Sequence, residues 1–451
     1  MPVVGVIGAA EVGTSGEGMT LKRSLTWVLA LVVVGIVGLF ALAHRAEIAP
    51  VEPPAAAAFS PELIARGEIL ATAGNCESCH TARDGQHFAG GLGIGTPFGT
   101  IYTSNITPDP ASGIGRWSEA AFARALHEGV ARDGSHLYPA FPFDHFTRVT
   151  DDDVCALYAY LMTRRPVNLV PPANTVPFPV NIRALQWGWK LLFFHPGVYQ
   201  RDPARSEAWN RGAYLSEGLA HCAACHSPRN ALGASETGSR AYAGGTVDGW
   251  VAPALTAANT APLPWTEEEL YGFLRNGGTA LHGVAAASMS EVIHFGLAKL
   301  PDADVKAIAT YFSDMNGSAT RAETVGAVLA KAMSASSVDE AEESDPGASL
   351  YIAACASCHY NGGPAPLIAR PELALNSALS GTEPTNLVQV MLHGIGLKDG
   401  APGLFMPPFA HLSDAEIASL VAYLRRTRTD RPAWTDLEGK VAAIRKAAGG
   451  S

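Results

Sequence analysis

The sequence is poor in charged residues and has no excess of positive charge. Only 16% of its 451 residues are charged, and 42 acidic residues against 32 basic ones give a net charge of −10. An acidic chain binds the phosphate backbone poorly, so we expect no nucleic-acid partner. The sequence also lacks a nucleotide-binding loop, a catalytic triad and a constellation of paired carboxylates. These absences leave no sign of catalytic chemistry carried by the chain's own side chains.

One long apolar run stands near the amino terminus. A basic pair precedes a charge-free stretch at 24–43, and a helix of about 20 residues spans the hydrocarbon core of a membrane. The basic pair predicts that residues 1–23 lie in the cytoplasm and that the bulk of the chain lies outside it. The alternative is a cleaved signal peptide, because the run ends in an A-x-A pattern. Residues 44–58 are rich in Pro and Ala and predict a short, stiff linker.

A single structural unit occurs three times after this linker. Each copy opens with a helical pattern that contains a glycine and leads into a cysteine motif. A loop rich in Gly and Pro, a middle helix and a closing helix with a tyrosine follow. The glycines and tyrosines are Gly67, Gly212, Gly347, Tyr160, Tyr311 and Tyr423. The predicted domains are 59–165, 203–315 and 345–427, with linkers at 166–202 and 316–344 and a carboxyl-terminal tail at 428–451. Because the first linker is rich in Pro and aromatic residues, we expect it to pack on a domain.

Six of the seven cysteines form three Cys-x-x-Cys-His motifs. Two thiols on one helical turn can form thioethers with the two vinyl groups at one edge of a porphyrin, and the adjacent histidine can bind the iron. A zinc site would need a second ligand pair, and thioredoxin-like motifs do not recur three times with a trailing histidine. We therefore predict three covalently bound haem c groups in a mainly α-helical chain of three tandem cytochrome c-like domains after an amino-terminal transmembrane helix. The motif residues are Cys76, Cys79, His80, Cys222, Cys225, His226, Cys355, Cys358 and His359.

The second and third units each offer a methionine as the sixth iron ligand. Met289 and Met406 occupy corresponding places, in loop sequences between the middle and closing helices. A methionine thioether is a usual distal ligand in electron-transfer haems, where it raises the reduction potential. We predict that the iron ligands are His226 with Met289, and His359 with Met406.

The first unit departs from this pattern. Its equivalent segment, LYPAFPFDHF, has Phe141 where the third unit has Met406, and a phenyl ring cannot bind iron. His145 lies four residues further on and carries a suitable donor nitrogen. We predict that His80 and His145 are the ligands of the first haem, which would lower its potential. The alternatives are His136, Met162 or an open coordination position.

At these residues the chain resembles the triheme cytochrome c subunits of membrane-bound bacterial dehydrogenases. The resemblance runs from about residue 48 to residue 426. It is strongest in the segment from TPFGTIYTSNITPDP to LYPAFPFDHF, in CHSPRN, and in MPPFAHLSDAEIASLVAYLR. The group includes the subunits of quinoprotein alcohol dehydrogenase and gluconate-type dehydrogenases, with relatives that serve molybdenum hydroxylases of the nicotinate and isoquinoline type. The family's distal methionines map onto Met289 and Met406, whereas its first-domain methionine maps onto Phe141. Phe141 with a nearby histidine looks more like the molybdenum-hydroxylase relatives.

The resemblance implies an electron-transfer subunit rather than an enzyme. Such a subunit takes electrons from a catalytic dehydrogenase partner and passes them to ubiquinone or to another cytochrome. It would sit in the bacterial inner membrane with the bulk of the chain facing the periplasm. The alternative is a haem enzyme, such as a peroxidase, in which the first haem keeps an open coordination position beside Phe141.

Overall fold

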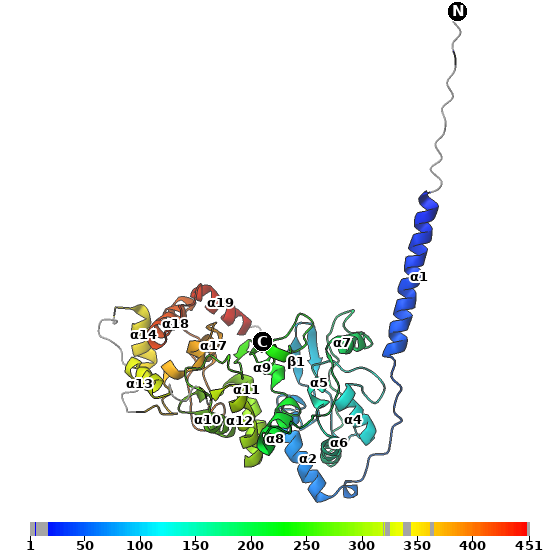
Figure 1. Cartoon of the computed structure of the whole chain (residues 1–451), viewed down its shortest axis with the longest axis horizontal. Helices are drawn as coiled ribbons and strands as arrows, with labels where there is room; N and C mark the ends of the chain where they lie inside the picture. Colours follow the sequence, from blue (N-terminus) through cyan, green and yellow to red (C-terminus); the bar gives the residue numbers. More distant parts are fainter. Residues whose placement is uncertain are drawn as a thin grey trace, which may run out of the picture.

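Helices joined by long loops make up most of the protein, with three short antiparallel hairpins. A computed structural model describes Gly5 and residues 17–318, 320, 325–336, 344–360 and 365–448. The first helix, α1 (Glu17–Ala43), rises from the body of the molecule (Figure 1). Its segment Ser24–Ala43 is long and apolar enough to cross a membrane. Parts of the predicted segments 1–23, 316–344 and 428–451 lie outside the described residues.

The first domain begins with a capped helix and ends with another. The Ser60 hydroxyl accepts a hydrogen bond from the Leu63 amide at the start of α2, and Thr150 does the same for Asp153 at the start of α6. The elements are α2 (Pro61–Ala73), α3 (Cys76–Cys79), β1 (Gly93–Thr96), β2 (Gly99–Tyr102), α4 (Glu119–Glu128), α5 (Phe143–Phe146) and α6 (Asp151–Met162).

The second domain repeats this order of helices. The Thr266 hydroxyl accepts a hydrogen bond from the Glu269 amide at the start of the middle helix. The elements are α8 (Glu207–Glu217), α9 (Ala223–His226), β3 (Gly245–Val247), β4 (Trp250–Ala252), α10 (Glu267–Asn276), β5 (Gly278–Thr279), β6 (Gly283–Val284), α11 (Ala287–Glu291) and α12 (Asp302–Met315). A short π-helical turn, Val292–Gly296, follows α11 directly.

The third domain follows α13 (Val325–Ala335) and ends in an added helix. Ser413 and Glu416 form a full capping box at the start of its closing helix. Residues of the predicted tail form α19, which packs on α17 and α18 and buries Val441 completely. The elements are α14 (Pro346–Ala354), α15 (Ala356–His359), α16 (Ser377–Ser380), α17 (Thr385–His393), α18 (Asp414–Arg428) and α19 (Leu437–Ala448).

In every domain the opening helix crosses the closing helix at the repeated glycine. A Cβ atom at this position would lie 2.4 Å or less from a backbone carbonyl oxygen of the closing helix. The pairs are Gly67 with Ala156, Gly212 with Ala307, and Gly347 with Ser419. The Cβ atom of the repeated tyrosine in the closing helix would also lie within 2.9 Å of the added Cβ atom. The two helices can approach this closely only because glycine has no side chain.

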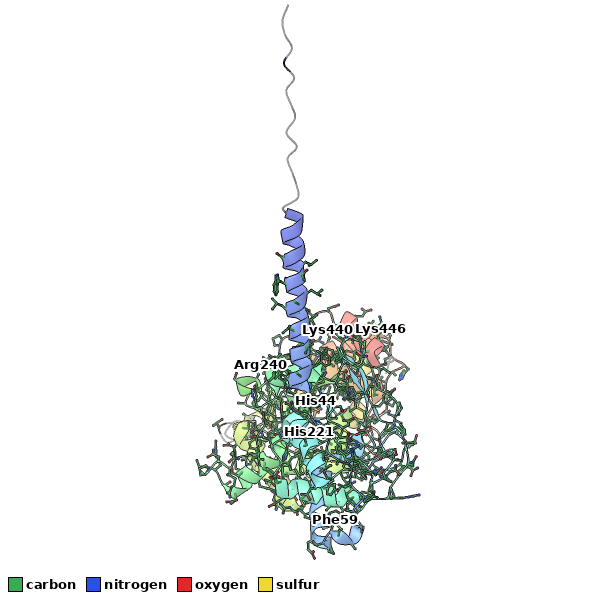
Figure 2. All side chains as sticks on the ribbon, turned by 90° about the vertical axis from the view of Figure 1, so that its right-hand side faces the viewer. His44, Phe59, His221, Arg240, Lys440 and Lys446 are labelled. Atoms are coloured by element: carbon green, nitrogen blue, oxygen red, sulfur yellow. The ribbon has the colours of Figure 1, made fainter. Side chains whose placement is uncertain are left out.

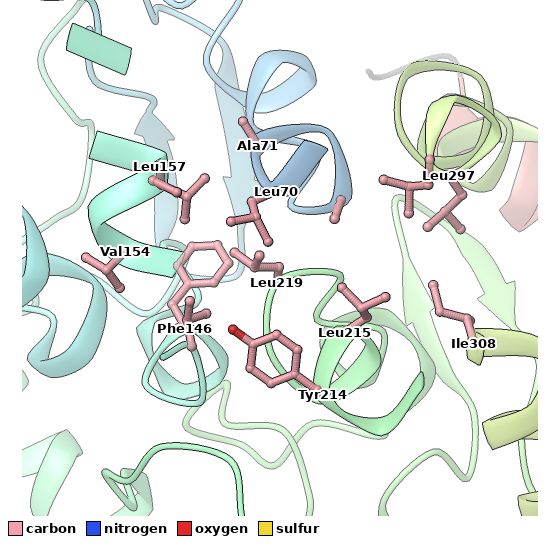
Figure 3. Packing of buried hydrophobic residues seen from close by; sticks show 14 of the residues in the cluster. Leu70, Ala71, Phe146, Val154, Leu157, Tyr214, Leu215, Leu219, Leu297 and Ile308 are labelled. Atoms are coloured by element: carbon pink, nitrogen blue, oxygen red, sulfur yellow. The ribbon is translucent and has the colours of Figure 1, made fainter. Parts of the chain in front are cut away.

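The three domains do not associate equally. Domains 1 and 2 share one hydrophobic core, in which Leu70 of α2 faces Leu215 and Leu219 of the second domain (Figure 3). Domain 3 has a separate core built around Tyr351 and Tyr423. The first two domains therefore form one packed body, to which the third is attached.

Both segments that flank domain 1 are packed against it. Backbone hydrogen bonds join Ile48 to Arg132 and Val51 to Arg116, so the stretch predicted to be a short, stiff linker lies on the domain surface. The linker 166–202 contains α7 (Leu185–Phe193). Its Trp189 and Phe194 pack on Phe143 of domain 1, in line with the predicted packing of this linker.

Candidate functional site

Each Cys-x-x-Cys-His motif lies on a short helix directly after the opening helix of its domain. The histidine of each motif has its Nδ1 atom within hydrogen-bond distance of a backbone carbonyl oxygen further along the chain. The pairs are His80 with Ser104 at 2.7 Å, His226 with Pro253 at 2.7 Å, and His359 with Pro371 at 3.2 Å. A histidine that donates Nδ1–H to a carbonyl keeps Nε2 unprotonated, which is the form that binds a metal ion.

All three motifs open into one continuous cavity of about 2240 Å³, and every cysteine and histidine of the motifs lines it. A site for one drug-sized ligand measures roughly 300–1,000 Å³, so this cavity has room for several such groups. Its wall is mainly apolar and includes Ile94 and Trp117 from domain 1, Trp250 and Trp265 from domain 2, and Leu387 from domain 3. Large, flat apolar groups would fit such a space.

The two predicted distal methionines line this cavity. Met289 lies on the short helix α11 and not in a loop as predicted, whereas Met406 lies in a loop and forms a pair of backbone hydrogen bonds with Ile395. Phe141 lines the cavity in the first domain. Each of these residues shares the cavity with the cysteine motif of its own domain.

Known proteins with similar sequences fit this arrangement. The family described as Cytochrome c matches residues 64–165, and the family described as Cytochrome C oxidase, cbb3-type, subunit III matches residues 342–424. The chain is 38% identical to the fructose dehydrogenase cytochrome subunit of Gluconobacter japonicus, over 83% of this chain and 81% of that protein. It is 35% identical to the cytochrome c subunit of the quinone-type alcohol dehydrogenase of Komagataeibacter europaeus, over 85% of this chain and 84% of that one. The chain belongs to the cytochrome c subunits of membrane-bound dehydrogenases.

A nicotinate dehydrogenase subunit of Pseudomonas putida is also similar to this cytochrome c subunit. The two are 46% identical over 99% of this chain, which spans only 38% of the length of that protein.

The motif residues of this cytochrome c subunit fit haem c. Burial lowers the pKa of His80, His226 and His359, so each imidazole is neutral at pH 7 and able to bind iron. Burial also raises the pKa of Cys76 and Cys222 to about 12, so both side chains stay uncharged. A mainly apolar pocket with neutral histidines suits a porphyrin joined through thioethers.

The structure places His145 at the edge of the first haem site rather than in its wall. His145 is not among the residues that line the cavity. Its Nδ1 atom lies 3.1 Å from the carbonyl oxygen of Glu217 in the second domain, and its buried Nε2 atom has no hydrogen-bond partner among the described residues. His145 can therefore bind iron through Nε2 only after its ring turns toward the cavity.

The alternative ligands from the sequence are less available. The Nε2 atom of His136 lies 2.8 Å from the Ala43 carbonyl oxygen, and its Nδ1 atom lies 3.0 Å from Nζ of Lys190. Both ring nitrogens are thus engaged. Met162 is buried in the hydrophobic core and does not line the cavity.

His221 is a histidine of the cavity wall that the sequence patterns do not predict. His221, immediately before Cys222, lines the cavity and packs against the rings of Phe146 and His145 from the first domain. Its backbone is left-handed, with φ of 37°, as is that of Asn75 before Cys76, with φ of 49°. Figure 2 shows His221 within the body of the molecule. Its position before the first cysteine of a motif is the signal that could have identified it.

Proposed function

We propose that this chain is a membrane-anchored electron-transfer subunit with three haem c groups. It takes electrons from a periplasmic catalytic dehydrogenase subunit and passes them to ubiquinone or to another cytochrome, and it has no enzymatic activity of its own. The observation that carries this proposal is the single cavity shared by all three Cys-x-x-Cys-His motifs. Cofactors that exchange electrons must lie close together, and one shared cavity supplies that proximity.

The residues of the chain hold and tune the haems, which when bound supply one-electron chemistry at iron. The cysteines fix the groups covalently, and the backbone carbonyls that accept Nδ1–H orient His80, His226 and His359. Met289 and Met406 are the proposed sixth ligands of the second and third haems. His145 is the proposed sixth ligand of the first.

Two kinds of catalytic partner are consistent with the relatives. The similarity to the cytochrome c subunit of the quinone-type alcohol dehydrogenase supports a complex of the quinoprotein type. The identity of 46% to the nicotinate dehydrogenase subunit, together with Phe141 and His145, favours a molybdenum hydroxylase. We propose the second.

The test is to purify the complex from membranes of the native host. The intact mass of this chain should exceed that of the apoprotein by three haems and should keep that excess after denaturation. Under anaerobic conditions the substrate of the co-purified dehydrogenase should reduce the haems, and a soluble ubiquinone analogue should reoxidise them. Two haems or fewer, or haems that the partner cannot reduce, would contradict the proposal.

Phe141 favours one alternative function. Because a phenyl ring cannot bind iron, the first haem of a peroxidase-like enzyme would keep an open position at this point. Carbon monoxide should then bind to one haem of the reduced wild-type protein, and hydrogen peroxide should be consumed with an electron donor. A six-coordinate carrier should bind little carbon monoxide.

A further inference from the structure

Helix α7 carries an exposed apolar face that the function proposed above does not use. The side chains of Leu191 and Leu192 are each 64% exposed. At helical spacing, Trp187 and Gly188 precede them by four residues, so these four positions form a stripe without a polar side chain. The opposite side of α7 is packed on domain 1. An uncharged stripe of this kind on a rigid helix marks a surface that contacts a partner or a membrane.

The position of α7 relative to α1 indicates which of these it contacts. Helix α1 contacts α7, and Figure 1 shows α7 beside the end of α1 that joins the body. Where burial along α1 is described (24–35 and 37–43), only Gly38, Leu39 and Ala43 are partly or fully covered. These residues belong to the last turns of the segment predicted to cross the membrane. Helix α7 therefore lies level with the point where the anchor leaves the bilayer.

Helix α7 is also held firmly in place. Nζ of its buried Lys190 donates hydrogen bonds to the carbonyl oxygens of Glu128 and Gly129, at 2.6 and 2.7 Å, at the end of α4. The ring of Trp189 packs edge-on against Phe143, with 6.0 Å between the centroids. His136, which contacts Lys190, is hydrogen-bonded to the carbonyl oxygen of Ala43 in α1. The anchor, α7 and domain 1 thus form one rigid joint.

We propose that α7 is a second membrane contact, whose face formed by Trp187, Gly188, Leu191 and Leu192 enters the interfacial layer of the leaflet from which α1 emerges. Trp and Leu side chains on a surface helix are typical of this layer. Arg240, Lys440 and Lys446 lie toward the same end of the body as α1, whereas Phe59 lies at the opposite end (Figure 2). Arg240 and Lys440 form ion pairs with Glu236 and Glu383, which leaves the exposed Lys446 to attract anionic phospholipid. With two contacts the body cannot swing about the anchor, which holds the haem domains in a fixed orientation over the membrane.

The inference rests on α1 being retained as an anchor. One set of samples tests both the anchor and the contact of α7 with the membrane. A nitroxide is attached to the full-length holoprotein at Leu192→Cys, and Cys155→Ala removes the remaining free thiol. The labelled protein is reconstituted in vesicles of phosphatidylethanolamine and phosphatidylglycerol. The control is Ile69→Cys, at a position that is 37% exposed on α2. Figure 1 shows α2 at the far end of the body from α1. The measured quantity is the ratio of collisions with oxygen to collisions with a water-soluble nickel chelate. We expect this ratio to be several-fold higher at position 192 than at position 69.

Each outcome has one meaning. Equal collision ratios at positions 192 and 69 in a sample whose intact mass includes α1 would overturn the membrane contact and leave the anchor in place. A label at position 192 that is shielded from both reagents only when a dehydrogenase subunit is added would overturn it in favour of a protein interface. A chain whose mass begins at His44 would overturn the anchor and, with it, the inference that α7 is a second membrane contact. The haem spectrum of each variant should match that of the wild type.

Discussion

At the scale of single residues, the sixth ligand sets the potential of each haem. Met289 and Met406 line the cavity, but so does Met391 of α17, which is 5% exposed. We expect Met289→Ala and Met406→Ala each to remove one methionine-to-iron charge-transfer signal and to lower one reduction potential, because sulfur ligation raises the potential. Redox titration and near-infrared absorbance measure both effects, and haem content should stay at three.

Met391→Leu is the matched control for this pair. It replaces one buried thioether by a side chain of similar volume, which typically costs less than about 1.5 kcal/mol. All methionine signals should persist in this variant. A signal that disappears in Met391→Leu and survives in Met406→Ala would assign the third iron to Met391 instead.

The first haem poses a sharper question, because two histidines lie near its distal side. We expect His145→Ala to open one coordination position, since its unpartnered Nε2 atom is the proposed donor. The reduced variant should bind carbon monoxide at one haem, and the oxidised variant should show a high-spin component in electron paramagnetic resonance. His145→Met should keep six ligands and raise that potential, because a thioether stabilises ferrous iron relative to imidazole.

His221→Ala serves as the comparison for His145. Its ring lies 6.4 Å from that of His145 and lines the cavity from the second domain. If only His221→Ala opens a haem, the ligand comes from the neighbouring domain, and His145 serves only to pack beside it. If neither variant changes the spectra, the first site is filled by some other group.

At this scale the sequence predicts some features better than others. The spacing of the nine motif residues depends only on local covalent geometry, so it can be read directly. The pairing of His145 with His221 depends on how α5 meets the segment before Cys222, some 70 residues later in the chain. No local pattern encodes that contact.

At the scale of elements, the helix crossing is the feature that the three repeats share. Gly212→Ala would place a Cβ atom 2.0 Å from the Ala307 carbonyl oxygen, and backbone atoms cannot move aside without separating α8 from α12. Such overpacking costs about 1–3 kcal/mol or more. We expect the thermal unfolding midpoint of the holoprotein to fall by several degrees, at roughly 2–4 °C per kcal/mol for a domain of this size class.

Gly272→Ala in α10 is the control for this substitution. A Cβ atom there would meet only the Thr279 methyl group, at 3.4 Å, and alanine favours a helix interior by about 0.5–1 kcal/mol over glycine. The midpoint should stay constant or rise. An equal loss in both variants would mean that the crossing is not tightly packed in solution.

The elements that the sequence did not predict share one property, which is that each is held in place by contacts with a domain surface. Helix α7 and the docked stretch after α1 lack the repeat pattern, and their conformation depends on domain 1 groups such as Phe143 and Arg132. Helix α19 lies in what composition describes only as a tail, and it is held by packing on α17 and α18. Periodicity identifies helices with a repeated partner, whereas these segments bind to surfaces that exist only after folding.

At the scale of the whole molecule, three similar units give an unequal assembly. The repeat predicts three equivalent domains, but the shared core of domains 1 and 2 uses residues such as Phe146, Tyr214 and Leu219 that lie at the contact of those two domains. Domain 3 contacts domain 2 through hydrogen bonds, such as those of Asn386 with Val251, and through a small apolar cluster that includes Leu263 and Leu375.

Gly400, six residues before Met406, is the centre of that interface. Its amide donates to Oγ of Ser290 at 3.1 Å, and its carbonyl oxygen lies 2.6 Å from Nε2 of His294. Ser290 directly follows Met289, so the two hydrogen bonds connect the two proposed distal loops. The same carbonyl packs on Gly277, where a Cβ atom would come within 2.2 Å of it. Gly400 thus fits between Gly277 and the helix that carries Met289.

We expect the double variant Ser290→Ala, His294→Ala to loosen domain 3 without loss of haem. Each buried backbone group left without its partner costs about 1–3 kcal/mol, and this cost falls on the contact rather than on either domain core. Calorimetry should then resolve a separate, lower unfolding transition for domain 3. The internal electron-transfer rate after photoreduction should fall, because the sites are no longer held at a fixed separation.

The control is His411→Ala, which changes an exposed histidine of domain 3. It should change neither the unfolding transition nor the electron-transfer rate. A double variant with wild-type unfolding and wild-type transfer rate would show that other contacts, such as that of α17 with β4 and the apolar cluster around Leu375, fix the third domain.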